Sequence, residues 1–208
     1  EVLLARERSV GDYQAVCRDL LKTVKDMRRL TGALLDTSLI EGGKLQPNSV
    51  IELKVLVAKV IERWTPSAKV RGLDIKWDFP GGEFLILGNE ELIDVAVSNL
   101  VDNAIKYSYE QGIVELRLSR LPEDIKLTIK DYGVGMNPAE REKLGNIFFR
   151  ADVSRSNKDS FGLGFANAKK ILQSHGARLF VTSVPKAGTE ISMVWEPANR
   201  SGTLPKPV

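Results

Sequence analysis

The stretch NEELIDVAVSNLVDNAIKY, residues 89–107, has the spacing of an amphipathic helix and carries three polar side chains on one face. Asn99, Asn103 and Lys106 stand at positions i, i+4 and i+7, so they project from the same side. The apolar residues that point in other directions and can serve a core are Leu92, Val95, Ala96, Leu100 and Ile105. An amide oxygen can ligate Mg²⁺ and a lysine can bind phosphate, although a solvated surface helix uses the same residue types.

Helical and strand patterns alternate on both sides of this segment. The helices that we expect are residues 50–70, 89–107 and 164–175. The strands that we expect are residues 73–79, 84–87, 114–118, 125–129, 179–181 and 191–195. A Pro-Gly-Gly turn at residues 80–82 returns the chain between the first two strands, and a turn around Pro122 makes the next two antiparallel neighbours. Between residues 132 and 161 we expect an irregular, functional segment. The order predicts an α/β two-layer sandwich with a mixed sheet and helices on one face.

The first forty residues form a different pattern. Apolar side chains recur at helical spacing between Val10 and Gly42, which predicts one long helix with an apolar face. No second helix of similar length follows at once, so a two-fold dimer is the simplest way to cover that face. Packing of the helix on its own domain is the alternative.

Composition excludes several classes of protein. The 208 residues are 43% hydrophobic and 27% charged, which is typical of a globular chain, and a net charge of +3 is too small to indicate nucleic acid binding. One cysteine and one histidine exclude a disulfide within the chain and a Cys/His zinc cluster. No apolar run is long enough for a membrane span, and no signal peptide is evident. We expect a cytoplasmic protein.

Three glycine motifs stand at strand or helix ends. Asp131 closes a predicted strand and is followed by Gly133 and Gly135. Its carboxylate could accept a hydrogen bond from an exocyclic amine, and the two glycines would let the backbone approach a flat ring. The other two motifs are Gly162-Leu163-Gly164, where free N–H groups at a helix start suit phosphate, and Gly188-Thr189, before the last strand. Each motif alone is also typical of an ordinary turn.

Taken together, in this order and spacing, these elements resemble the N, G1, G2 and G3 boxes of sensor histidine kinases, within the GHKL ATP-binding superfamily. Residues 99–108 resemble the N box, 131–135 the G1 box and 162–164 the G2 box, and residues 147–150 are similar to the F box. Residues 24–45 resemble the second helix of the family's dimerisation and phosphotransfer domain. The resemblance extends to about residue 197. It implies a long dimerisation helix before the sandwich.

The resemblance implies a role for each matching residue around ATP. Asn103 would hold Mg²⁺ on the triphosphate with Asn99 beside it, Lys106 would contact phosphate and Tyr107 would pack near the adenine. Residues 137–161 would form a lid over ATP. The lid residues that could neutralise phosphate charge during transfer are Arg150, Arg155 and Lys158.

The glycine motifs take the remaining roles. Asp131 would accept from the adenine amine, and Gly133 and Gly135 would give the base room. The residues that would seat the phosphates or lie near the adenine are Gly162, Leu163, Gly164 and Thr189. The chain departs from the family pattern at Tyr132, where Asn is usual, and at Ser160, where Gly is usual. We expect both departures to affect the lid and the affinity for ATP.

Asn99 also separates the branches of the superfamily. ATP-hydrolysing relatives and anti-sigma serine kinases have a Glu there that can act as a base, and Asn cannot. The predicted activity is therefore transfer of the ATP γ-phosphoryl to a histidine. The only histidine, His175, resembles the family's His-Gly helix stop rather than the acceptor. We expect the acceptor helix to precede this chain.

These inferences give a division into three parts. Residues 1–45 would be a partial dimerisation and phosphotransfer region, 46–197 an ATP-binding catalytic domain and 198–208 a tail. The implied partners are ATP with Mg²⁺, a response regulator and a second copy through the N-terminal helix, without nucleic acid or membrane. The alternative is an ATP-sensing or partner-docking module that transfers no phosphate.

Overall fold

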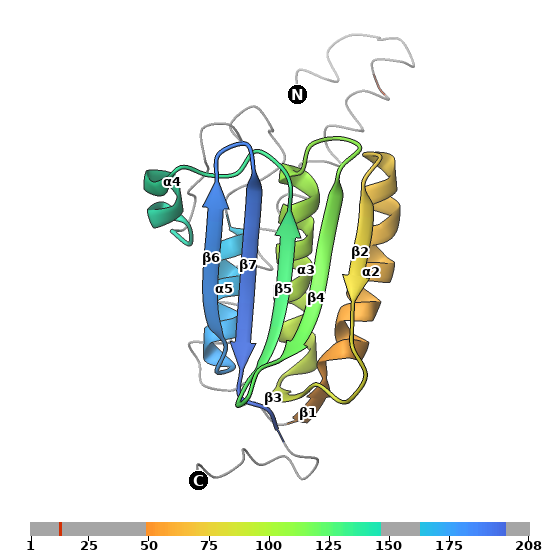
Figure 1. Cartoon of the computed structure of the whole chain (residues 1–208), viewed down its shortest axis with the longest axis vertical. Helices are drawn as coiled ribbons and strands as arrows, with labels where there is room; N and C mark the ends of the chain where they lie inside the picture. The colour runs from red at the N-terminus through yellow and green to blue at the C-terminus, as the bar shows by residue number, and fades with distance from the viewer. Residues whose placement is uncertain (1–12, 14–48, 147–162, 199–208) are drawn as a thin grey trace.

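The computed structural model describes residues 13, 49–146 and 163–198. Its strands form a five-stranded mixed sheet in the order β2-β4-β5-β7-β6 and a two-stranded sheet of β1 and β3 (Figure 1). The strands are β1 (Ser49–Glu52), β2 (Asp74–Asp78), β3 (Leu85–Gly88), β4 (Ile113–Arg120), β5 (Ile125–Asp131), β6 (Arg178–Val184) and β7 (Gly188–Trp195). The helices are α2 (Leu53–Val70), α3 (Glu90–Tyr107), α4 (Pro138–Lys143) and α5 (Gly164–Ser174).

The three longer helices lie on one face of the five-stranded sheet. Figure 1 shows α2, α3 and α5 behind the strands, and the core lies between the two layers. Along β5 every second residue is buried, so Ile125, Leu127 and Ile129 face the helices. The predicted α/β two-layer sandwich with a mixed sheet and helices on one face is confirmed. Within the described residues, no helix is long and apolar enough to cross a membrane.

Two helices lie where the sequence predicts them because local signals define their ends. The side chain of Asn89 accepts a hydrogen bond from Leu92 N at 3.0 Å and caps the start of α3. His175 follows the last residue of α5, and its ring Nδ1 lies 2.7 Å from Ile171 O. Its ring is buried, and Gly176 has a φ of +74°. The prediction that His175 and Gly176 form a helix stop is confirmed.

The helix predicted over residues 50–70 begins three residues late, because Ser49–Glu52 form strand β1. Val50 pairs with Leu87 of β3 in antiparallel register. The Glu52 carboxylate marks the end of the strand. Its Oε1 accepts hydrogen bonds from Lys54 N at 3.2 Å and from Phe84 N at 3.0 Å. Long-range pairing therefore outweighs the helical spacing at these residues.

The hairpin predicted between residues 73–79 and 84–87 is wrong. β2 pairs in parallel with β4, whereas β3 crosses to β1 in the smaller sheet. The turn between them is held by Lys54, whose Nζ donates to the carbonyls of Pro80 at 2.7 Å and Gly82 at 3.1 Å. The predicted antiparallel pair is confirmed in β4 and β5.

The segment predicted as irregular contains the short helix α4. Asn137 and Glu140 form a reciprocal capping box at its start. The predicted helix over residues 10–42, apart from Tyr13, and the residues similar to the F box lie outside the described residues.

Candidate functional site

Strand ends and a helix end meet at the upper end of the sheet in Figure 1. There β5 ends at Asp131, β6 ends at Val184, β7 begins at Gly188 and α3 ends at Tyr107. Val134 N donates to Tyr107 O at 3.1 Å, which ties the loop after β5 to the end of α3. Tyr107 from the N box, the G1 box and the Gly-Thr motif are thereby brought together at this end of the sheet.

Asp131 is the buried carboxylate of this end. Its side chain lies on the helix-covered face with the core residues of β5, and the residue is 6% exposed. Oδ1 accepts from Gly133 N at 3.0 Å and from Thr189 N at 3.1 Å. Burial raises the pKa of Asp131 from 3.8 to about 6, although the two amide hydrogen bonds act in the opposite direction. The hydrogen bonds given by the described residues end on Oδ1, so Oδ2 remains available to accept from a ligand donor.

Glycines allow the backbone segments to touch at this point. A Cβ on Gly133 would lie 1.7 Å from Tyr107 O, and one on Gly135 would lie 1.9 Å from Val184 O. Gly188 has a φ of +95°, and its Cβ would lie 2.0 Å from Asp131 O. Each glycine therefore makes room for another part of the chain, and a side chain at any of them would force the strand ends apart.

The two asparagines of α3 lie beside the start of α5. A Cβ on Gly164 would lie 3.5 Å from Asn99 Oδ1 and 3.8 Å from Asn103 Nδ2. Leu163 precedes this helix and provides no side-chain cap. The first N–H groups of α5 and the two amides are therefore gathered where an anion can be bound.

Lys106 has an ion-pair partner that the sequence reading did not assign. Its Nζ pairs with Asp102 Oδ2, one turn earlier on α3, and both side chains are largely buried, at 21% and 17% exposure. The pair holds the lysine on the same helix as Asn103. The signal was visible as an i, i+4 spacing of opposite charges.

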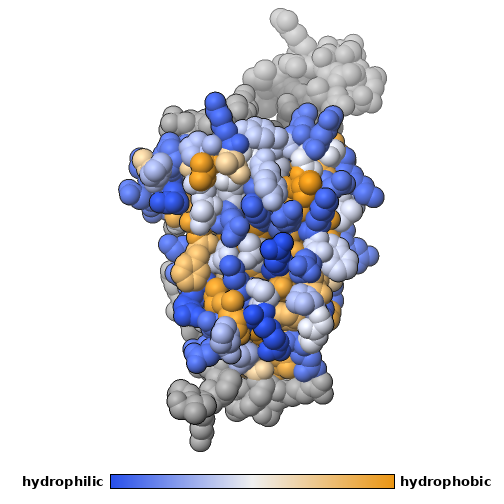
Figure 2. Space-filling view, in the orientation of Figure 1, coloured by the Kyte–Doolittle hydropathy of each residue, from blue (hydrophilic) through white to orange (hydrophobic). Residues whose placement is uncertain are grey.

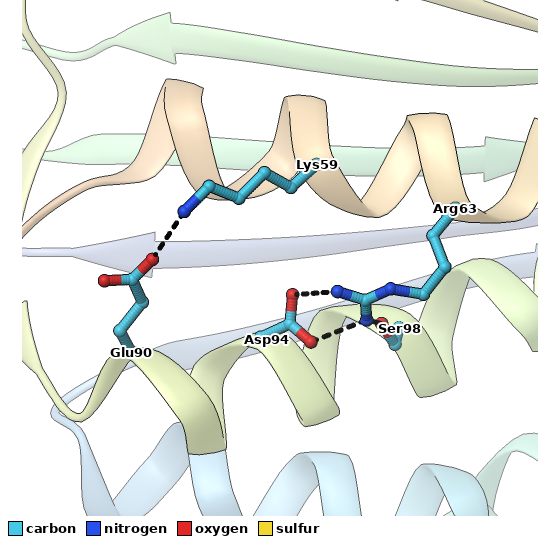
Figure 3. Close-up of polar contacts among 5 residues, drawn as sticks. All are labelled: Lys59, Arg63, Glu90, Asp94 and Ser98. Carbon is cyan, nitrogen blue, oxygen red and sulfur yellow. Dashed lines mark hydrogen bonds and ion pairs between the residues drawn. The ribbon is translucent and has the colours of Figure 1, made fainter.

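Three polar contacts join α2 to α3 on the outer side of the helix layer (Figure 3). Lys59 Nζ lies 3.1 Å from Glu90 Oε1. Arg63 makes a bidentate contact with Asp94 at 2.7 and 3.1 Å and also donates to Ser98 Oγ. The hydrogen bond to Asp94 raises the pKa of Arg63. These contacts are partly exposed, so they orient the helices more than they stabilise them.

Tyr132 points away from Asp131. It follows the buried carboxylate in the strand direction, so its ring lies on the opposite face of the sheet, where it is 40% exposed. Its hydroxyl donates to Glu115 Oε2 at 3.1 Å, and Lys130 Nζ lies 4.7 Å from the ring centroid. Figure 2 shows this open face as a mixture of hydrophilic and hydrophobic side chains. The Tyr132 side chain therefore lies on the face of the sheet opposite to the Asp131 carboxylate.

Other predicted residues lie outside the described residues. They are Arg150, Arg155, Lys158, Ser160 and Gly162. Conversely, the sequence reading missed Ser183, which is buried beside Thr189 and accepts from Met136 N at 2.8 Å. Its only signal was its register, because it stands in β6 on the same face as the buried residues. Within the described residues, no group of three or more His, Cys, Asp or Glu side chains could hold a metal ion.

Comparison with known families gives a match over residues 88–199 to the model described as histidine kinase-, DNA gyrase B-, and HSP90-like ATPase. The sensor-like histidine kinase SenX3 of Mycobacterium tuberculosis is 29% identical over 198 residues, which cover 93% of this chain and 47% of that protein. The heme sensor protein HssS of Staphylococcus saprophyticus is 35% identical over 179 residues, which cover 86% of this chain and 38% of that protein. The chain thus spans about half or less of the length of these relatives.

Solved structures show the same fold. The histidine kinase AdeS of Acinetobacter baumannii aligns with a TM-score of 0.75 at 19% identity, over 95% of this chain and 90% of that chain. Full-length ShkA in complex with AMPPNP aligns with a TM-score of 0.76 at 20% identity, over 94% of this chain and 42% of that chain.

Proposed function

Because the chain belongs to the family of histidine kinase-, DNA gyrase B- and HSP90-like ATPases, we propose that it is the ATP-binding catalytic part of a sensor histidine kinase. In this proposal, ATP binds at the end of the sheet and its γ-phosphoryl is transferred to a histidine outside this chain. A response regulator then receives the phosphoryl group on an aspartate.

The observation that carries the proposal is the Asp131 carboxylate. One oxygen is held by the amides of Gly133 and Thr189, while the second oxygen accepts from none of the residues that the structure describes. An exocyclic amine is the complementary donor, and adenine carries one. Burial makes such a hydrogen bond stronger than it would be in water, because no solvent competes for the carboxylate.

The triphosphate is assigned to the opposite side of the site. Asn99, Asn103 and the first N–H groups of α5 surround Gly164, and this set of neutral donors and acceptors fits a polyphosphate and its metal ion. We propose that Asn103 binds Mg²⁺ through its amide oxygen, because an amide oxygen can ligate the ion without adding negative charge beside the phosphates. The ion would offset the charge of the phosphates. Lys106 would leave or share Asp102 to contact them.

The remaining assignments follow the family resemblance and rest on it. Tyr107 is proposed to pack near the adenine, and Leu163 with Gly162 to seat the phosphates. Arg150 and Arg155, with Lys158, are proposed to neutralise charge during transfer. Asn99 cannot take a proton from water, so ATP should persist until an acceptor imidazole attacks it. The γ-phosphorus then bonds to the imidazole nitrogen, its bond to the bridging oxygen breaks, and ADP leaves.

We also propose the division and the partners inferred from the sequence. Residues 46–197 would form the catalytic domain, residues 1–45 a dimerisation region that pairs with a second copy, and 198–208 a tail. Ala198 N donates to Leu85 O at 2.7 Å, which joins this residue to the start of β3. The site is proposed to face the cytoplasm, where ATP is available.

The first test is calorimetric titration of the 208-residue chain with ATP, with and without Mg²⁺. We expect one binding site, weaker without Mg²⁺, that is lost in Asp131→Asn because the amide places a donor opposite the adenine amine. Asn103→Ala should remove the Mg²⁺ dependence. Ser192→Ala is the matched control, since Ser192 is buried on β7 and contacts Thr128 rather than Asp131.

A second measurement tests phosphoryl transfer. A peptide carrying an acceptor histidine helix is supplied with the chain and labelled ATP, and we expect phosphohistidine that is stable in base and labile in acid. Binding of ATP without any transfer would favour the alternative, a nucleotide-sensing module. A folded wild-type chain that binds no ATP would refute the assignment of the site.

A further inference from the structure

Ser183 lies in the wall of the site, next to the residue that holds Asp131. On β6 it stands opposite Thr189 of β7, just as Val181 stands opposite the buried Ile191. Both hydroxyl groups therefore lie on the helix-covered face, together with the Asp131 carboxylate. Ser183 is 8% exposed, so its hydrogen bonds are made inside the protein.

The three partners of Ser183 Oγ fix the position of its proton. A hydroxyl has one proton to donate and two lone pairs to accept with. Met136 N, at 2.8 Å, can only donate, and Gly188 O, at 3.1 Å, can only accept. Ser183 therefore gives its single proton to Gly188 O. Thr189 Oγ1, at 2.9 Å, must then donate to the second lone pair of Ser183. This is the arrangement in which all four groups are satisfied.

The consequence is that Thr189 has no proton left for a ligand. Its backbone N–H is bonded to Asp131 Oδ1 and its hydroxyl proton to Ser183, so Thr189 Oγ1 presents lone pairs only. The site wall next to Asp131 is thus made of acceptors. A ligand group that donates is favoured there, and a ligand carbonyl meets only repulsion.

Resting on the proposed function, we propose that Ser183 is a positioning residue that sets the base specificity of the site. By holding the Thr189 hydroxyl as an acceptor, it favours a purine with an amino group at C6 over one with a carbonyl at C6. Without Ser183, the Thr189 hydroxyl can rotate and donate to that carbonyl.

Binding of ATP and ITP to the same variants tests this inference, because ITP has a carbonyl at C6 and a proton on N1, whereas ATP has an amino group at C6 and an unprotonated N1. We expect the wild-type chain to prefer ATP. In Ser183→Ala the ratio of the two dissociation constants should narrow by about tenfold, since a repulsive contact becomes a hydrogen bond. If the role of Ser183 were purely structural, the substitution would weaken the binding of both nucleotides equally and leave the ratio of their dissociation constants unchanged. Ser192→Ala, a buried serine on the opposite face of β7, should leave the ratio at its wild-type value.

Thr189→Val gives a second, independent variant in case Ser183→Ala does not fold. It removes the acceptor itself, so the ratio should narrow as well, and adding Ser183→Ala to it should narrow the ratio no further. An unchanged ratio in Thr189→Val, additive effects in the double variant, or equal binding of ATP and ITP to the wild-type chain would overturn the inference. A wild-type chain that binds neither nucleotide would instead refute the proposed function.

Discussion

Substitution of Asp131 by asparagine is expected to stabilise the chain while it removes ATP binding. Burial raises the pKa of the carboxyl from 3.8 to about 6, so the folded chain binds more protons than the unfolded chain between these two values. Stability therefore falls as the pH rises from about 4 to about 6 and is level above that window. A shift of about two units costs about 3 kcal/mol at pH 8, at about 1.4 kcal/mol per unit. Asp131→Asn keeps an acceptor for Gly133 N and Thr189 N without the charge.

Urea unfolding of both chains at pH 8 and pH 5, without nucleotide, measures this effect. Trp195 is buried, so its fluorescence reports on unfolding. We expect Asp131→Asn to be more stable at pH 8 by up to about 3 kcal/mol and by about half as much at pH 5, where the wild-type carboxyl is largely protonated in the folded state. Equal stabilities at pH 8, or an advantage that does not change with pH, would refute the argument that burial of this charge is costly.

Two further predictions concern the free energy of unfolding. One tests the close backbone contact at Gly133, and the other tests the surface ion pair of Arg63. Gly133→Ala places a methyl group against Tyr107 O and should lower the free energy of unfolding by at least about 3 kcal/mol in a urea titration. Gly81→Ala is the control. It has open space around it and should be close to neutral. A loss below about 1 kcal/mol at Gly133 would contradict the packing of this loop. Arg63→Ala breaks the exposed contact with Asp94 and should cost less than about 1 kcal/mol of unfolding free energy. The affinity for ATP, measured by calorimetry, should not change. A severalfold change in that affinity would show that the contact between the helices influences the site.

The parts of the fold that could be predicted are those whose signals are local. The helix α3 has its cap, Asn89, and its apolar spacing within one segment, and β4 and β5 are joined by a short turn. Strand β1 could not be predicted in the same way. It has four residues, and its partner β3 begins more than thirty residues later, so the local pattern of Val50 and Ile51 is compatible with either state.

The same distinction applies to the candidate site. The polar row of α3 and the glycine motifs could be found because spacing within a segment marks them. Ser183 could not, since its partners Met136, Gly188 and Thr189 are brought to it only when the loop after β5 and the hairpin of β6 and β7 come together. The register of Ser183 in an alternating strand predicts which face it lies on but not which groups it contacts.

The motif glycines Gly133 and Gly135 could be located from the sequence, but the physical reason why glycine is needed there could not. The sequence alone suggests that Gly133 and Gly135 leave room for a ligand base. In the structure, the positions of their absent Cβ atoms are filled by the carbonyl oxygens of Tyr107 and Val184, so these glycines let the ends of α3, β5 and β6 touch. That contact places the amide of Gly133 against Asp131, and Gly188 allows the same approach from β7. Glycine is therefore required here to build the carboxylate's surroundings, and any effect of these positions on ligand affinity should come with a loss of stability.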